Sequence, residues 1–277
     1  MRIGVVSDLH VDLNEGPSSR GEVVASLSAA AARRGAELLI VAGDIANRYD
    51  ASLRTLAALE AASGLRVLFV PGNHDVWNEA STLPFGRGWG AWDSYRALEA
   101  FPGNLARGPV DLPGGWSVVG DLGWYDYAFG HPRFSAEDFD RMRFGERLWL
   151  DKVNALWDRP AREMHRLFHG KLERQLAGRS GERLVLVTHA VSHAAFTVQP
   201  PDPQWEYLNA FLGSPGYGEL AIRCGVAAAV CGHVHYRRRT VVGGTHFICS
   251  CLGYSTEWAD PRDIAGEVER SLAILDL

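Results

Sequence analysis

The stretch "AAAVCGHVHYRRR", residues 227–239, indicates both the fold and the kind of site that this chain builds. It begins as a short apolar run, reaches Gly232, and then places His233 and His235 one residue apart, ahead of three arginines. A continuous apolar run of this length is consistent with a strand that is buried on both faces. In open α/β sheets the carboxyl ends of such strands are where ligands bind, so these imidazoles are candidate functional residues.

Four other apolar runs end in the same way, with aspartate, asparagine or histidine just after the last apolar residues. The segments are "RIGVVSDLH", "ELLIVAGD", "RVLFVPGNHD" and "RLVLVTH", and their terminal polar residues are Asp8 and His10; Asp44; Asn73, His74 and Asp75; and His189. Strand ends that share one edge of a sheet can converge even when they are far apart in sequence. We therefore expect these side chains to form one site.

The spacing within the pairs agrees with convergence. In Asp8-Leu9-His10 and His233-Val234-His235 the two polar residues are separated by one position, so an extended chain places both on the same side. Glycines precede three of the polar positions, at Gly43, Gly72 and Gly232, and glycine permits sharp turns and close backbone approach.

Short strand-like runs alternate with helical stretches rich in alanine and leucine along the chain. Helices are predicted at about 22–34 and 52–62, and strands at 3–7, 37–42, 66–70, 116–119, 183–188, 226–231, 240–242, 245–250 and 271–275. Alternating strands and helices indicate βαβ units, and the continuous apolar character of the strands indicates burial on both faces. The sequence thus predicts an α/β fold.

Residues 126–158 interrupt this alternation with many aromatic residues and arginines. Pro160 can open a helix that continues to about Leu176 with an apolar stripe, and that helix is expected to belong to the main layers. We interpret 126–158 as a helical insertion or lid within a single domain over 1–277. An ordinary subdomain that covers an edge of the core is the alternative.

Composition restricts the function classes. The 277 residues are 47% hydrophobic, their apolar runs are too short to span a membrane, and the net charge of −5 argues against a dedicated DNA-binding face. The four cysteines form no CxxC pair and are expected to be free thiols. The chain opens without a charged leader or cleavage site, so we expect a cytoplasmic protein.

The convergent residue set points to metal ions. Buried carboxylates and imidazoles that face one another are costly unless a cation lies among them. Mixed nitrogen and oxygen ligands suit Mn, Fe, Zn or Ni, and of these we favour Mn. The set has more ligands than one ion normally takes, so we expect two divalent ions, roughly 3.5–4 Å apart, bridged by a carboxylate.

In this order, the motifs DLH, GD, GNHD, TH and GHVH resemble those of the calcineurin-like metallophosphoesterases, over residues 1 to about 242. The resemblance implies a four-layer β-sandwich of two mixed sheets flanked by helices. It also implies two ligand sets that share Asp44: Asp8, His10, Asp44 and His235 on one ion, and Asp44, Asn73, His189 and His233 on the other. Purple acid phosphatases carry a tyrosine where this chain has Asn47, so a tyrosinate-bound ferric site is not expected.

The expected activity is hydrolysis of a phosphoester by attack of a metal-activated hydroxide on phosphorus. His74 is the candidate general acid for the leaving group, and Asp75 is a candidate to orient its ring. Arg48 is a candidate contact to the substrate phosphate, with a surface arginine at a helix start as the alternative. Tyr125 is a candidate for the wall of the substrate pocket.

Several alternatives remain open at this point. Within the class, a nucleotide or nucleic-acid phosphodiesterase competes with a phosphomonoesterase, since aromatic residues of 126–158 could stack on a base. Outside it stand a non-catalytic metal-binding scaffold and a binuclear amide or ester hydrolase, whose sites generally open with HxH instead of Asp8-Leu9-His10. The expected partner is a phosphoester substrate, for instance a nucleotide; neither a membrane nor an obligate protein partner is expected.

Overall fold

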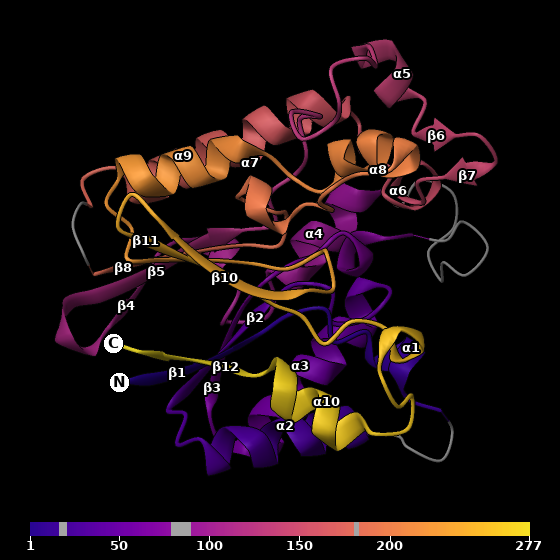
Figure 1. Ribbon diagram of the computed structural model, residues 1–277. Helices are drawn as coiled ribbons and strands as arrows, with labels where there is room; N and C mark the ends of the chain where they lie inside the picture. The colour runs from indigo at the N-terminus through magenta and orange to yellow at the C-terminus, as the bar shows by residue number, and fades with distance from the viewer. Residues whose placement is uncertain (17–20, 79–89, 180–182) are drawn as a thin grey trace.

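The computed structural model describes residues 1–16, 21–78, 90–179 and 183–277, and among them it contains two large mixed sheets. The first sheet has the order β12-β1-β2-β3. Its parallel strands are β1 (Arg2–Val6), β2 (Leu38–Ala42) and β3 (Arg66–Val70), and β12 (Ala273–Asp276) pairs antiparallel with β1. The two ends of the chain therefore lie side by side (Figure 1).

The second sheet has the order β10-β11-β9-β8-β5-β4. Four neighbouring strands are parallel, and an antiparallel strand closes each edge. The strands are β4 (Val110–Leu112), β5 (Trp116–Asp121), β8 (Leu184–Thr188), β9 (Ala228–Cys231), β10 (Arg237–Val242) and β11 (Thr245–Ser250).

The two sheets pack face to face through aliphatic side chains. Ile40 of β2 and Val70 of β3 belong to the same buried cluster as Val118, Val187 and Val230 of the second sheet. Each of these strands is buried on both faces, because the outer faces are also covered, and this explains their continuous apolar sequences.

Helices cover the outer face of each sheet and complete four layers. α2 (Glu22–Arg33), α3 (Tyr49–Ser63) and α10 (Ile264–Ser271) lie on the first sheet, while α7 (Ala161–Leu176) and α9 (Pro215–Arg223) lie on the second (Figure 1). The predicted α/β sandwich flanked by helices is confirmed. No helix within the described ranges has the length and apolarity needed to cross a membrane.

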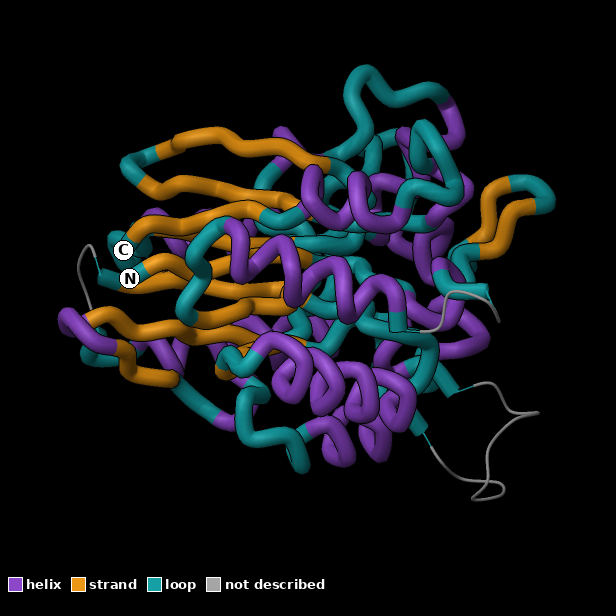
Figure 2. The backbone as a smooth tube through the Cα atoms, turned by 90° about the horizontal axis from the view of Figure 1, so that it is seen from below, coloured by secondary structure: helices purple, strands orange, loops and turns teal. Residues whose placement is uncertain are grey.

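The remaining elements are short and connect the layers. Between β5 and α7 lie α5 (Ala136–Asp140), the two-stranded β6–β7 ribbon (Arg143–Phe144 and Arg147–Leu148) and α6 (Asp151–Asn154). Figure 2 shows this ribbon standing apart from the strands of the two main sheets. The others are α1 (Val11–Asn14), α4 (Ala91–Leu98), α8 (Pro203–Leu208) and the 3-10 turns η1 (His74–Val76), η2 (Leu105–Arg107), η3 (Pro113–Gly115), η4 (Ala194–Phe196), η5 (Asn209–Phe211) and η6 (Ser255–Glu257).

All four cysteines are free, as expected from their spacing, and Cys231, Cys249 and Cys251 are buried. The arginines that follow His235 begin β10. The side chain of Arg237 is bound within the fold. Its guanidinium donates to the buried Glu267 of α10 at 2.5 Å, which connects the edge strand to that helix.

Candidate metal centre

The carboxyl ends of β1, β2, β3, β8 and β9 meet at one edge of the sandwich, and all seven predicted metal ligands converge there. Three overlapping groups have candidate ligand atoms within 4.8 Å of one another: Asp8, His10 and His235; His10, Asp44 and His74; and Asp44, His189 and His233. Asn73 adds an amide oxygen to the last group. The arrangement is thus a single cluster with Asp44 at its middle.

One half of the cluster gathers around His10 and His235. Their Nε2 atoms are 3.2 Å apart, and Nε2 of His235 is 3.5 Å from Oδ1 of Asp8. Nε2 of His10 is 3.8 Å from Oδ2 of Asp44. The other ring nitrogen of His235 is held by Glu257, whose Oε2 is 2.7 Å from Nδ1.

The other half gathers around His189. Its Nε2 is 3.0 Å from Oδ1 of Asn73, 3.1 Å from Nδ1 of His233 and 3.3 Å from Oδ2 of Asp44. Nδ1 of His189 is 2.9 Å from the carbonyl oxygen of Ala42. This contact is made when Nδ1 carries a proton, so Nε2, the atom turned toward the cluster, offers a lone pair when the ring is neutral.

The backbone at the ligands differs from the extended form predicted by the i, i+2 spacing. Asp8, His10, Asp44, His233 and His235 all have positive φ, between 40° and 76°. Aspartate and histidine are among the residues that tolerate this left-handed region, but it still costs free energy. The side chains of each pair nevertheless reach one cluster, because the chain turns at each ligand instead of running straight.

The three glycines beside the ligands leave no room for a side chain. A Cβ at Gly72 would lie 2.1 Å from Oδ1 of Asp44, and one at Gly232 would lie 2.6 Å from Oδ2 of Asp8. A Cβ at Gly43 would lie 2.6 Å from Nδ1 of His189. The glycines predicted from sequence to allow close approach therefore form the cradle of the site.

Burial keeps the imidazoles of His10 and His233 neutral, whereas the pKa of His235 is raised, because its bond to Glu257 and the charge of Asp8 outweigh its burial. Desolvation lowers the pKa of His233 to about 3 and holds the pKa of His10 well below its usual value. Burial also disfavours the charged form of His189, but the carboxylates of Asp44 and Asp8 outweigh it and raise that pKa to about 10. The pKa of Asp44 is well below its usual value, since the surrounding imidazoles, His189 first, outweigh its own burial.

His74 lies beside the cluster and is oriented by a residue that the sequence did not suggest. Its Nδ1 is 2.6 Å from Oδ1 of Asn47, and its ring stacks on Trp77 at a centroid distance of 3.6 Å. Nε2 then faces Asp44, at 3.9 Å from Oδ2, and the hydroxyl of Tyr254, at 3.4 Å. Burial lowers the pKa of His74 to about 4.

Asp75, predicted to orient the ring of His74, is bound elsewhere. Its carboxylate accepts backbone N–H bonds from Asp44 at 2.9 Å, Ile45 at 3.0 Å and Gly72 at 2.7 Å, and a short bond from the hydroxyl of Ser52. It therefore locks the loop after β2 to the loop after β3. It positions ligands through the backbone, and Asn47 takes the contact with the His74 ring.

Arg48 and Tyr125 also differ from their predicted surroundings. Arg48 caps α3 with Nε 3.1 Å from Oδ1 of Asp50, and it does not line the large pocket beside the cluster. Tyr125 is only 2% exposed and donates its hydroxyl at 3.3 Å to Asp151. These placements favour the alternative of a helix-start arginine for Arg48 and place Tyr125 behind the site rather than on the pocket surface.

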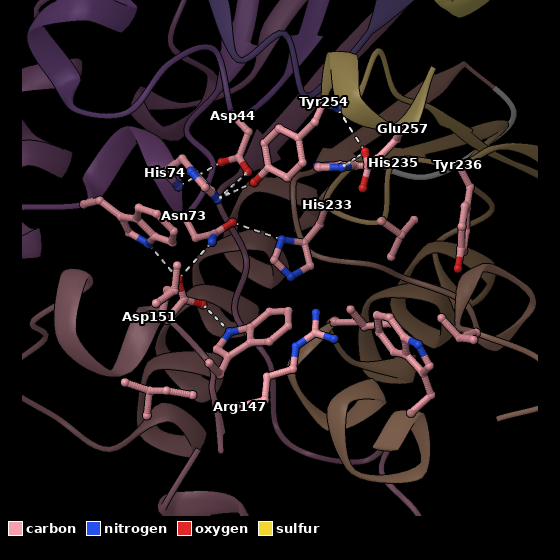
Figure 3. A pocket seen from close by; sticks show the side chains of 18 residues that line it. Asp44, Asn73, His74, Arg147, Asp151, His233, His235, Tyr236, Tyr254 and Glu257 are labelled. Carbon is pink, nitrogen blue, oxygen red and sulfur yellow. Dashed lines mark hydrogen bonds and ion pairs between the residues drawn. The ribbon is translucent and has the colours of Figure 1, made fainter. Parts of the chain in front are cut away.

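Asp151 is a site residue that sequence reasoning missed. Its buried carboxylate accepts from Nδ2 of Asn73 at 2.8 Å and from the indoles of Trp77 at 2.7 Å and Trp149 at 2.8 Å (Figure 3). It comes from the segment 126–158, where no periodic pattern singles it out. Tyr254 and Glu257, which follow β11, were also missed, because no periodic pattern singles them out.

A pocket of 640 Å³ opens beside the cluster. Asp44, Asn73, His74, His233 and His235 line one end (Figure 3). The rest is lined by Trp77, Arg147, Leu148, Trp149, Leu150, Asp151, Val198, Trp205, Leu212, Val234, Tyr236, Tyr254 and Glu257. Segment 126–158 thus contributes a continuous stretch, residues 147–151, to the pocket wall.

Two mixed sheets with clustered imidazoles and carboxylates at their carboxyl edge define a metallophosphoesterase-type fold and site. The family model of the calcineurin-like phosphoesterases matches residues 1–237, and the chain belongs to this family. The resemblance predicted from the motifs is confirmed. Membership of this family supports metal-dependent hydrolysis of phosphoesters and implies a site for two divalent ions.

A solved structure with a TM-score of 0.75 shows the same fold. Phosphopantetheinyl hydrolase from Mycobacterium tuberculosis is 20% identical, with 99% of this chain and 95% of that chain covered and a TM-score of 0.75. A dimetal phosphatase from Danio rerio is 17% identical, with 90% and 86% covered and a TM-score of 0.49. A search of curated proteins finds no match to this chain.

The residues present fit a pair of divalent ions. Nε2 of His10 and Nε2 of His235 face each other, and Nδ1 of His10 is buried without a hydrogen-bond partner among the described residues. Metal binding requires deprotonated imidazoles; burial favours this form for His10 and His233, and a bound cation would displace the proton that nearby carboxylates favour on His189 and His235. Several lone-pair donors turned toward one another around a buried carboxylate are the expected donor set of a metal centre.

Proposed function

We propose that this chain hydrolyses phosphoesters that carry a sizeable organic group, with the help of two divalent ions. The observation that carries the proposal is the three overlapping groups of candidate ligands, two of which include Asp44, beside a 640 Å³ pocket. We assign Asp8, His10, Asp44 and His235 to one ion, and Asp44, Asn73, His189 and His233 to the other. Mixed nitrogen and oxygen donors favour Mn, Fe, Zn or Ni over Mg or Ca, and we propose manganese.

When bound, the ions would supply positive charge at the phosphoryl group and lower the pKa of a water molecule enough to make it a nucleophile near neutral pH. The chain's own contribution is to fix the donors before substrate arrives. Asp75 holds the loop of Asp44, Asp151 holds Asn73, and Glu257 holds His235. Such preorganisation avoids reorganisation during the reaction.

His74 is proposed to protonate the leaving group. Asn47 accepts the Nδ1 proton of its ring, so Nε2, which faces the pocket side of Asp44, is the atom that gains and then donates a proton when the ring becomes protonated. The ring is neutral in its buried setting, and the negative charge of a bound phosphoester favours the protonated form. A positioned acid of this kind contributes about 10²–10⁴-fold to the rate.

We further propose that 1–277 acts as one domain in which segment 126–158 serves as an insertion with a lid-like role over the substrate. Its support is the wall that residues 147–151 form and the bond from Asp151 to the ligand Asn73.

Parallel turnover assays test the function. The purified chain is freed of metal and incubated with Mn²⁺, Ni²⁺, Zn²⁺ or no metal, then given 4-nitrophenyl phosphate and bis(4-nitrophenyl) phosphate. Metal-dependent release of nitrophenolate is expected. A preference for the diester would support a phosphodiesterase and a preference for the monoester a phosphatase. A nucleotide and a phosphopantetheinyl ester, the latter suggested by the name of the similar hydrolase, extend the panel.

The scaffold alternative makes the opposite prediction. A chain that binds two ions yet releases no nitrophenolate with any metal would contradict the proposed function. Asp44→Asn is the matched variant, since it removes the charge shared by both donor sets and is expected to abolish metal-dependent turnover.

A further inference from the structure

The pocket beside the metal centre is larger than a phosphoryl group requires. Its 640 Å³ lies within the range of roughly 300–1,000 Å³ that is typical of sites for organic ligands. The metal ligands occupy only one end, so the far end contacts the part of a substrate that is not being cleaved.

The wall of the pocket is aromatic and partly rigid. The Trp149 indole donates to Asp151 at 2.8 Å, stacks on Phe211 at a centroid distance of 5.4 Å and lies 5.8 Å from the ring of His233. Trp205 and Tyr236 line the same pocket. A planar or apolar group would find contact surface here without much reordering of the wall.

Arg147 brings a positive charge to this wall (Figure 3). It is the one arginine or lysine among the described residues that line the pocket, and its guanidinium lies 5.8 Å from the ring of Trp205. Across the described ranges it has no ion pair or side-chain hydrogen bond. Its charge is therefore available to a ligand.

The carboxylates that line the pocket do not neutralise Arg147, because each is engaged elsewhere. Asp44 lies among the imidazoles, and Asp151 accepts from Asn73 and two indoles. Glu257 binds His235 at 2.7 Å and the backbone N–H of Tyr254 at 3.0 Å. The pocket thus has its carboxylates at the metal end and an unpaired guanidinium at the other.

We infer that Arg147 binds a second anionic group, a phosphate or carboxylate, on the organic part of the substrate. This inference rests on the proposed function and narrows its substrate class to phosphoesters with two separated anionic groups joined by an apolar or planar portion. The planar fork of a guanidinium matches both phosphate and carboxylate oxygens, and such bonds are among the stronger ones in proteins.

Binding by isothermal titration calorimetry tests the inference with defined probes. Thymidine 5′-monophosphate is the probe with one anionic group. Thymidine 3′,5′-bisphosphate adds a second phosphate, and 3′-O-succinyl thymidine 5′-monophosphate adds a carboxylate instead. Each probe is titrated into the metal-free chain and into the chain with Mn²⁺. The matched variants are Arg147→Gln and Arg143→Gln, since Arg143 is an exposed arginine on the same ribbon that does not line the pocket.

At least one doubly anionic probe is expected to bind the wild-type chain about 10-fold more tightly than the monophosphate, as the loss of one charge-assisted contact implies. Arg147→Gln should remove this preference, and Arg143→Gln should retain it. Equal binding of the three probes, or a preference that survives in Arg147→Gln, overturns the inference.

Hydrolysis of 4-nitrophenyl phosphate or bis(4-nitrophenyl) phosphate by the wild-type chain separates this failure from failure of the proposed function. Turnover with equal probe binding would leave the function standing and remove the second-anion subsite. A preference that depends on Arg147 without turnover under any metal would keep the subsite and remove the hydrolase.

Discussion

The side-chain amide of Asn73 donates a hydrogen bond of 2.8 Å to the buried carboxylate of Asp151. Because Nδ2 is held on that side, Oδ1 of Asn73 faces His189 and His233, at 3.0 Å from a ring nitrogen of each. An amide has two similar ends, and this bond decides which end faces the metal centre. Asp151 therefore orients a proposed ligand although it is outside the proposed donor set.

Replacing Asp151 by asparagine should weaken metal binding. The N–H₂ group of the new asparagine would face N–H donors that need an acceptor. Asn73 would therefore lose its fixed orientation. Partners of metal ligands typically contribute about 10–100-fold to metal affinity, and a loss of that size is expected here. Calorimetric titration with Mn²⁺ and the metal content after dialysis measure it.

Asp140→Asn is the control for this variant. Asp140 belongs to the same segment and accepts a bond from Tyr127, but it makes no contact with a predicted ligand. Metal affinity should stay at the wild-type level in this control. A folded Asp151→Asn chain that retained two ions at wild-type affinity would contradict the positioning role.

His74→Asn should affect substrates according to their leaving groups. An alkoxide needs a proton as it departs, whereas nitrophenolate needs little, so the loss should approach 10²–10⁴-fold for an alkyl ester and be much smaller for a nitrophenyl ester. Initial rates on a matched alkyl and nitrophenyl pair at fixed Mn²⁺ measure this difference. Equal losses on both esters would remove the acid role.

Asn47→Ala complements that experiment. It removes the acceptor that fixes the His74 ring at 2.6 Å but leaves the imidazole in place. The same dependence on leaving group is expected, at a smaller magnitude, because the ring would still be present but less well oriented.

Gly72→Ala tests the close approach that shapes the centre. The added Cβ would meet Oδ1 of Asp44 at 2.1 Å and its backbone nitrogen at 2.3 Å, so the loop must shift. Overpacking of this kind typically costs about 1–3 kcal/mol of the free energy of unfolding. We also expect a smaller increase in Tm on addition of Mn²⁺, since a displaced Asp44 would bind the ions less well.

Gly170→Ala is the matched glycine variant. Gly170 lies inside α7, where an added Cβ would meet only the end of the Arg174 side chain, at 3.5 Å. Alanine is favoured over glycine in helices by about 0.5–1 kcal/mol, so this chain should be as stable as the wild type or slightly more so. If the two glycine variants had the same free energy of unfolding, the space around Asp44 would not be tight.

The convergence of the candidate donors could be predicted from sequence because it follows a simple rule of sheet geometry. Each ligand comes within a few residues of the end of a buried strand, and parallel strands bring those ends to one edge. His189 and Asp44 are 145 positions apart, yet their side chains lie 3.3 Å from each other. The apolar runs, together with the polar residues at their ends, indicated this proximity.

The surroundings of the donors could not be predicted in this way. Asp151 belongs to an irregular segment whose path depends on tertiary packing, and Glu257 belongs to a loop after β11 with no strand-end signature. Asp75 directly follows His74, so adjacency suggested contact, but the η1 turn directs its carboxylate to the backbone of the neighbouring loop. Irregular backbone, unlike a strand, has no periodicity from which side-chain direction can be read.

The bond between Arg237 and Glu267 gives a pH-dependent prediction away from the metal centre. Glu267 is 3% exposed, and this burial by itself raises the pKa of its carboxyl group. Hydrogen bonds from Arg270 at 2.8 Å and Arg237 at 2.5 Å outweigh the effect of burial, so the pKa is below its usual value. A lowered pKa in the folded state means that the carboxylate stabilises the fold above the pKa of the unfolded chain. That contribution is lost as pH falls through the folded-state pKa.

Glu267→Gln should therefore lower the free energy of unfolding at pH 7 by about 1.5–3 kcal/mol, the range for hydrogen bonds to charged groups. The difference from wild type should shrink as pH falls below about 4.3, the ordinary pKa of glutamate, because the wild-type carboxylate becomes protonated. Urea unfolding at several pH values measures it. Glu146→Gln, at an exposed glutamate on the β6–β7 turn, should show little difference at any pH. A Glu267→Gln deficit that stayed constant down to the lowest pH would show that packing, and not the charge, is responsible.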